Sequence, residues 1–218
     1  MLLISAKEIM PIFKLSGFNI LIKITRLTIL LFALPVLQAC VSVPSKPIDQ
    51  AENLALHQQH LQKIAQIQQF SIKGRIGVQA DGKGFSGGLD WQHDAKQDIL
   101  ALYSPIGGQV ANIEKTAEQV TLTDAKGNKI SALDAESLTE KTLGWKLPLA
   151  GLADWVLGRP SKSPIQGSAW NEQGFLTFLK QDGWEIQFDQ YSQQHDNYLP
   201  NKIIIRNEKA YLKLLIIQ

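Results

Sequence analysis

The sequence predicts an α+β fold that is mainly β, with one curved antiparallel sheet and helices packed on one of its faces. Apolar residues alternate with polar ones over much of the chain, as they do in half-buried strands. Short turns join these segments and leave no room for crossover helices, so the sheet is expected to be antiparallel. Two short helical patterns interrupt the strands in the middle of the chain, which predicts a helical insert covering the sheet.

The first strand is predicted where Phe70, Ile72, Ile76 and Val78 alternate with polar residues, up to a turn signal at 81–84. Further turn signals with glycine lie at 126–128 and 181–183. Strands before the insert are expected at about 85–91, 98–103, 109–115 and 119–124. Strands after it are expected at about 175–181, 184–188, 202–206 and 211–217.

Three helices are expected. The first covers about 50–68, where Leu54, Leu61, Ile64 and Ile67 form a narrow apolar stripe. The second begins at the capping residue Asp134 and runs through about Leu143 to Gly144. The third covers about 149–157 and ends before a Gly-Arg-Pro sequence. Its Leu149, Leu152, Ala153 and Val156 share one face.

The amino-terminal segment predicts export and lipidation. Four basic residues precede an apolar run of 10 residues at 27–36, which fits a signal peptide and is short for a membrane span. The following Leu37-Gln38-Ala39-Cys40 resembles the lipobox of bacterial lipoproteins, in which the cysteine is acylated. We therefore expect a signal at 1–39, lipidated Cys40 with a proline-bearing tether at 40–49, and one domain at 50–218. The alternative is a buried cysteine behind an amino-terminal anchor helix.

Composition narrows the function classes further. One cysteine in 218 residues excludes an intramolecular disulfide. Loss of the signal leaves 18 basic against 19 acidic residues, so the mature chain carries a net charge of −1 instead of the +2 of the whole sequence. This balance predicts no nucleic-acid partner.

A search for catalytic and metal-binding motifs predicts neither an enzyme nor a cofactor. The glycines at 82–87 match the G-x-G-x-x-G pattern, but strand-like sequence follows where a dinucleotide site needs a helix. His57 and His60 lie three residues apart on the first helix and could share a metal. They lack a third ligand nearby in sequence, so we expect them on a solvated face and expect no metal site.

An unusual connection joins two predicted strands at Ser104-Pro105-Ile106-Gly107-Gly108. Proline and two glycines indicate a tight turn, yet the turn carries a large aliphatic residue. An exposed isoleucine forgoes roughly 1.5–3 kcal/mol of burial. Ile106 either folds back onto the sheet or forms a tip that touches a membrane.

Taken in order, several segments resemble the LolB family of outer-membrane lipoproteins, which receive other lipoproteins in Gram-negative bacteria. The resemblance covers nearly the whole mature chain, although no single motif is as specific as a metal-site signature. It is carried by the lipobox and by residues 103–108, 147–149, 154–160, 183–186 and 199–200.

The resemblance implies an incomplete antiparallel β-barrel, with helices forming a lid over a hydrophobic cavity. It also implies that the chain accepts triacylated lipoproteins from a LolA-like periplasmic carrier and inserts them into the inner leaflet of the outer membrane without nucleotide. The membrane-insertion loop would be Pro105, Ile106 and Gly107, with isoleucine where the family has leucine. Val41 and Ser42 include no aspartate, which in this family indicates outer-membrane residence.

The cavity hypothesis names the residues at alternating strand positions and on the lid helices. A one-residue error in a strand would place its residues on the opposite face. The expected lining consists of Ile76, Val78, Leu89, Trp91, Leu100, Leu102, Ile113, Leu122, Leu143, Leu152, Val156, Phe178 and Ile186.

The implied partners are the carrier, lipoprotein acyl chains and outer-membrane phospholipid, and the protein is expected to act as a monomer facing the periplasm. Two other functions remain open. One is a structural or assembly lipoprotein with a solid core and no ligand cavity. The other is an envelope enzyme, for which the sequence offers no convergent nucleophile and base.

Overall fold

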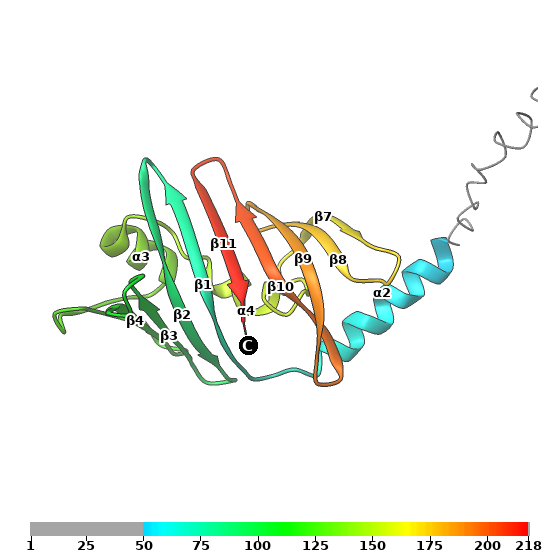
Figure 1. Cartoon of the computed structure of the whole chain (residues 1–218), viewed down its shortest axis with the longest axis horizontal. Helices are drawn as coiled ribbons and strands as arrows, with labels where there is room; N and C mark the ends of the chain where they lie inside the picture. The colour runs from blue at the N-terminus through cyan, green and yellow to red at the C-terminus, as the bar shows by residue number, and fades with distance from the viewer. Residues whose placement is uncertain (1–49, 218) are drawn as a thin grey trace, which may run out of the picture. The chain divides into compact units, whose positions relative to one another are not determined.

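The computed structural model describes residues 50–217, so the predicted signal, Cys40 and the tether lie outside the described residues. In the described part, eleven strands form one antiparallel sheet in the order β6-β5-β4-β3-β2-β1-β11-β10-β9-β8-β7 (Figure 1). The strands are β1 (Phe70–Ala80), β2 (Lys83–His93), β3 (Asp98–Tyr103), β4 (Gln109–Lys115), β5 (Val120–Asp124), β6 (Lys129–Ala132), β7 (Ile165–Trp170), β8 (Leu176–Gln181), β9 (Trp184–Gln194), β10 (Asn197–Arg206) and β11 (Ala210–Ile216).

The sheet is open, because β6 and β7 end it on either side and do not pair with each other. Its middle is made by β1 and β11, which are far apart in sequence and pair from Gly74 with Ile216 to Ala80 with Ala210. The helical insert, α3 (Ala135–Leu143) and α4 (Leu149–Trp155), connects the two edge strands. Its buried side chains belong to the same hydrophobic cluster as the inward side chains of the strands. We call the face on which this insert packs the covered face. The predicted fold class is confirmed.

Tight turns occur where the sequence predicted them. Ala80 pairs with Lys83, so Asp81 and Gly82 form a two-residue hairpin loop. Their φ angles of 47° and 74° are the left-handed values of a type I′ turn, which matches the twist of antiparallel strands. The hairpin between β8 and β9 uses the same Asp-Gly pair at 182–183.

The boundaries predicted for α3 are confirmed. The Asp134 side chain accepts a hydrogen bond of 2.7 Å from the Ser137 backbone N–H, which caps the first turn. At the other end Gly144 has a φ of 84°, and its N–H donates to the carbonyls of Thr139 and Glu140. A left-handed glycine of this kind is a common end for a helix.

The first helix, α2 (Gln50–Ile64), is shorter than the predicted 50–68, and its buried face differs from the prediction. Leu54 is 42% exposed, whereas His57 and His60 are buried. The prediction that both histidines lie on a solvated face is therefore wrong. Aromatic residues from β7 and its connection to β8 cover them: the His57 ring stacks on Trp170 at 4.2 Å, and His60 packs against Phe175.

Two strands were missed. Residues of β6 are exposed or half-exposed along its length, so no alternation marks it. The residues of β7 are likewise exposed or half-exposed, and the pairing of β7 with β8 shifts register twice. Both are edge strands held by backbone pairing with one neighbour, a contact that side-chain patterns do not report.

Candidate functional site

Two features define the candidate site, an exposed loop between β3 and β4 and the apolar interior of the covered face. In the loop, Ile106 is 96% exposed, which excludes the alternative that it folds back onto the sheet. Pro105 occupies the second position of a turn that closes with a 2.9 Å hydrogen bond from the Gly107 N–H to the Ser104 carbonyl.

Two further hydrogen bonds hold this loop. The Ser104 N–H donates to the Gly108 carbonyl at 2.7 Å, and the Gly108 N–H donates to Ser104 Oγ at 3.1 Å. Gly107 has a φ of 90°, a value that suits glycine and that a side chain would strain. The loop is therefore a fixed support that presents one aliphatic side chain to its surroundings.

The interior of the covered face holds most of the side chains that were predicted to line a cavity. Leu143 is partly buried and packs against the same cluster. The lid contributes large side chains as well, among them Leu147, Leu149 and Trp155. The predicted residues that are buried are Ile76, Val78, Leu89, Trp91, Leu100, Leu102, Ile113, Leu122, Leu152, Val156 and Ile186. That these residues line a lipid cavity stays a prediction.

Phe178 is the exception, and its predicted placement on the covered face is wrong. Leu179 is fully buried and pairs with Ile186, whereas Phe178 pairs with Gln187 on the opposite face and is half-buried. The cause is a register shift between β7 and β8, which leaves Thr177 as an extra residue between the paired positions. An extra residue of this kind reverses the face of every residue that follows it.

Gln181, a residue that the sequence analysis did not single out, fastens the end of the lid. Its side chain is fully buried, and Oε1 accepts hydrogen bonds from Trp155 Nε1 at 3.1 Å and from the Ser161 N–H at 2.9 Å. Its Nε2 donates to the carbonyls of Ser161 and Ser163. This amide thus satisfies an indole that would otherwise be buried without a partner.

Arg159 makes a second attachment. Nε donates to Asp154 Oδ1 at 2.8 Å, and Nη1 donates to the carbonyls of Ile64 and Ile67 at 2.6 and 3.1 Å. The guanidinium therefore joins the end of α4 to the end of α2, where backbone carbonyls and a positive charge are complementary. Its place in the sequence after a glycine gave no signal of this role.

Thr139 connects the two lid helices. Its buried Oγ1 donates to the Ala135 carbonyl at 2.8 Å and accepts a hydrogen bond of 2.9 Å from the Leu147 N–H. The connection between α3 and α4 is thus tied back to the middle of α3.

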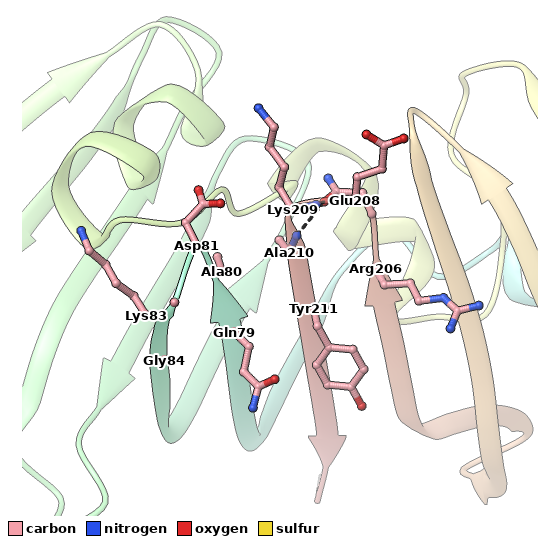
Figure 2. A pocket seen from close by; sticks show the side chains of 12 residues that line it. Gln79, Ala80, Asp81, Lys83, Gly84, Arg206, Glu208, Lys209, Ala210 and Tyr211 are labelled. Carbon is pink, nitrogen blue, oxygen red and sulfur yellow. Dashed lines mark hydrogen bonds between the residues drawn. The ribbon is translucent and has the colours of Figure 1, made fainter.

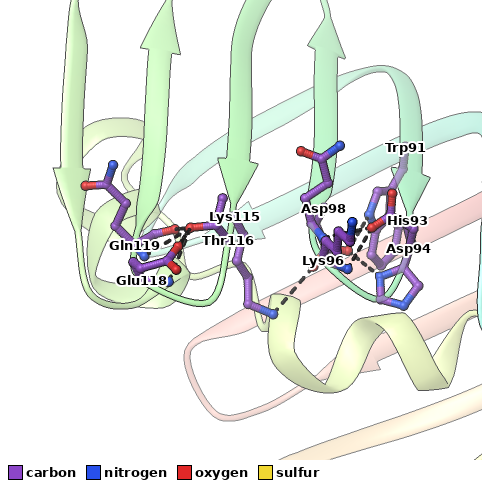
Figure 3. A network of polar contacts seen from close by, with 10 residues as sticks. Trp91, His93, Asp94, Lys96, Asp98, Lys115, Thr116, Glu118 and Gln119 are labelled. Carbon is purple, nitrogen blue, oxygen red and sulfur yellow. Dashed lines mark hydrogen bonds and ion pairs between the residues drawn. The ribbon is translucent and has the colours of Figure 1, made fainter.

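A buried carboxylate, that of Asp98, joins three neighbouring strands (Figure 3). Asp98 is 3% exposed, and its Oδ1 accepts hydrogen bonds from Trp91 Nε1 at 3.0 Å and from His93 Nδ1 at 2.7 Å. Lys115 Nζ lies 3.4 Å from Oδ2. These contacts orient the Trp91 ring in the core and hold β2, β3 and β4 together at the end opposite the β1–β2 turn.

Within residues 50–217, no group of three histidine, cysteine or carboxylate side chains is placed to hold a metal ion. None of the helices in that range is long and apolar enough to cross a membrane. Burial, together with the charges of His57 and Lys63, lowers the pKa of His60 to about 4.

These features define a protein with one open antiparallel sheet, a helical lid over its apolar face and a rigid loop that exposes an aliphatic residue. The sequence model described as outer membrane lipoprotein LolB matches residues 68–218. This chain belongs to the LolB family.

Individual relatives agree with the family match. An outer-membrane lipoprotein LolB of Nitrosomonas europaea is 30% identical over 86% of this chain and 90% of its own. Another, of Chromobacterium violaceum, is 34% identical over 67% of this chain and 78% of its own. The crystal structure of a LolA superfamily protein from Nitrosomonas europaea aligns with a TM-score of 0.49 at 8% identity, over 74% of this chain and 91% of that one. The family assignment rests on the sequence matches, and it makes the chain a lipid-anchored protein of the outer membrane that faces the periplasm.

Proposed function

We propose that this protein receives triacylated lipoproteins from a soluble LolA-like periplasmic carrier and inserts them into the inner leaflet of the outer membrane without nucleotide. Family membership supports a lipoprotein receptor at the outer membrane, and a carrier rather than an enzyme. The observation that carries the mechanism is the pairing of a lid-covered apolar interior with a 96% exposed isoleucine on a rigid loop of the same sheet.

The physical need for such a protein follows from the ligand. Three acyl chains hold roughly 40 methylenes, and their exposure to water would cost on the order of 30 kcal/mol at about 0.8 kcal/mol each. A lipoprotein therefore does not cross the periplasm unprotected. Transfer without nucleotide requires only that affinity for the acyl chains rise from carrier to receptor to bilayer.

The covered face would hold the acyl chains. In the described structure the lid side chains pack on the inward strand residues. An acyl chain must therefore displace part of the lid as it enters. The predicted lining residues keep this role as a proposal, with Leu179 in place of Phe178. The ligand would replace contacts between apolar side chains with contacts of the same kind, which keeps the cost of displacement low.

Ile106 would enter the bilayer during release. Pro105 and Gly107 shape the turn beneath it, so the side chain is already in place before it meets lipid. An exposed aliphatic residue gains about 1.5–3 kcal/mol when it leaves water. That gain is enough for a transient contact and too small for a permanent anchor.

The permanent anchor would be Cys40, which becomes the amino-terminal residue when residues 1–39 are removed. The tether at 40–49 would let the single domain at 50–218 work as a monomer in the periplasm. Mass spectrometry of the membrane-extracted protein tests this arrangement, since an acylated amino-terminal Cys40 is the expected result and an intact 1–39 segment would contradict it.

One observation favours a second candidate, a structural lipoprotein with a solid core. Eleven of the predicted lining residues are already buried against their neighbours. A fluorescent fatty acid distinguishes the two functions. A receptor binds the fatty acid saturably and releases it when unlabelled lipoprotein competes for the same site. A solid core would show no displaceable binding.

A further inference from the structure

We propose that acyl chains reach the covered face through one port, the seam between the α3–α4 connection and the tips of the β1–β2 and β10–β11 hairpins. The inference rests on the proposed function, because it concerns the path taken by the same lipid. It assigns a lipid-contacting role to residues 80–81, 144–146 and 209–210, which lie apart from the Ile106 loop.

A small pocket already exists at this seam. It has a volume of about 90 Å³, and Ala80, Ala210 and Trp145 form its apolar part. These three side chains are only 5–8% exposed and belong to the hydrophobic cluster of the covered face. The pocket therefore leads from solvent directly onto the core.

The side chains that the sheet presents to the covered face are small at this point. Ala80 on β1 pairs with Ala210 on β11, whereas two residues further along the same strands Val78 pairs with Leu212. All four side chains are buried on the same face, so the apolar side chains become smaller toward the hairpin tips. This taper leaves room under Trp145 that larger residues would fill.

The hydrogen bonds that join the lid to other elements lie away from the seam. Gln181 and Arg159 join the end of the lid to β8 and to the end of α2. Within the described part of the chain, no hydrogen bond or ion pair joins residues 144–146 to either hairpin tip. Lys83 lies over Gly144 there, with Cδ and Nζ 3.2 and 3.3 Å from the position that a Gly144 Cβ would occupy. The seam is accordingly where the lid separates most easily.

The rim of the pocket suits a ligand with an apolar chain and a polar head. Asp81, Lys146 and Lys209 line it beside the apolar residues. On the other side of the same two hairpin tips lies a wider surface pocket of about 580 Å³, in which Glu208 and Lys209 extend outward (Figure 2). The acylated cysteine and the first residues of a lipoprotein would lie among these side chains while its acyl chains pass inward.

The pocket of about 90 Å³ is well below the roughly 300–1,000 Å³ of typical ligand sites and is too small for an acyl chain. Uptake therefore requires Trp145 to move away from the two alanines. Filling the seam from the side of the sheet should slow this step, because an added side chain occupies the space through which the chain passes.

The test measures how fast a dansyl-labelled fatty acid binds to the full mature protein. Ala210→Leu should slow association by about tenfold or more, the size of effect that overpacking a tight site produces. The matched control is Ala135→Leu, which adds the same side chain at an alanine 7% exposed at the start of α3. Because this control overpacks the same apolar cluster away from the port, it should associate within about twofold of the unmodified protein even if its stability falls. An Ala210→Leu protein that binds at the unmodified rate, or an equal delay in both variants, overturns the port.

A second measurement covers the case in which Ala210→Leu does not fold. A benzophenone amino acid placed at exposed Lys209 should cross-link to the acyl chains of a lipoprotein during loading. The same amino acid at exposed Lys96, in the β2–β3 turn at the opposite end of the strands, should not. Equal cross-linking at both positions, or cross-linking at Lys96 alone, overturns the port. Failure of the unmodified protein to bind any fatty acid would instead refute the proposed function on which the port rests.

Discussion

Replacing Ile106 with glutamate should separate delivery to a bilayer from every earlier step. The side chain is 96% exposed, and the hydrogen bonds of its loop are made by Ser104, Gly107 and Gly108. The substitution removes no buried contact. The free energy of unfolding should therefore change by no more than about 0.5 kcal/mol, and capture of a lipoprotein should be unaffected.

The expected loss in delivery follows from the burial that Ile106 would gain in lipid. Moving an isoleucine side chain out of water is worth about 1.5–3 kcal/mol, which corresponds to roughly 10- to 150-fold in affinity for the bilayer. Glutamate loses this gain and adds a charge that the apolar region disfavours. Delivery should fall at least about tenfold, whereas Ile106→Leu should keep it.

The assay loads each variant with a labelled lipoprotein, adds liposomes and measures the label that floats with them. Leu133→Glu is the matched control, because Leu133 is 90% exposed but follows β6 at the end of the strands opposite the Ile106 loop. It should deliver normally. Normal delivery by Ile106→Glu, or an equal defect in Leu133→Glu, would refute the proposed role of the loop.

Three further predictions concern the lid and α2. Gln181→Leu should lower the free energy of unfolding by about 2–4 kcal/mol in urea titrations, because it leaves the Trp155 indole buried without an acceptor; a loss below about 0.5 kcal/mol would argue against this attachment. Arg159→Lys should increase amide hydrogen exchange near the end of α2, since one ammonium cannot reproduce the guanidinium contacts; unchanged exchange would contradict the clamp. The pKa of His60 is lowered to about 4, so its burial as a neutral ring contributes stability above pH 6.5 that is lost as the pH falls toward 4. That loss should amount to at most about 3 kcal/mol and be absent in His60→Phe, whereas parallel stability curves for the two proteins would contradict the assignment.

Local chemistry was sufficient to predict many of the elements. Asp-Gly at 81–82 and 182–183 formed the expected hairpin turns, and Asp134 with Gly144 set both ends of α3. These features depend on neighbouring residues alone. Strand faces were also predictable wherever the pairing is regular, as for Leu100, Leu102 and Ile113.

Contacts between segments far apart in sequence determine the features that the sequence did not predict. His57 and His60 are buried because Trp170 and Phe175, more than 100 residues away, pack against them. Phe178 lies on the other face because the register shift beside it depends on how β7 pairs with β8. The lid attachment at Gln181 likewise depends on Trp155, which another element brings to it.

For the candidate site, the sequence identified the loop and the apolar interior but not how the lid is held. Ile106 is an aliphatic residue between proline and glycine, and this pattern can be recognised in the sequence without knowledge of the fold. Gln181, Arg159 and Thr139 act through backbone groups and an indole of other elements, and no motif precedes them. A buried polar residue is hard to distinguish from a surface one in sequence alone.

The most direct test of the central claim uses the mature chain, residues 40–218, with the substitution Cys40→Ala that removes the proposed anchor, and a soluble carrier loaded with a lipoprotein. The two are mixed without lipid or nucleotide and then separated. The proposal predicts that the lipoprotein moves from the carrier to this protein and stays soluble in the new complex. Retention of the lipoprotein by the carrier would contradict it.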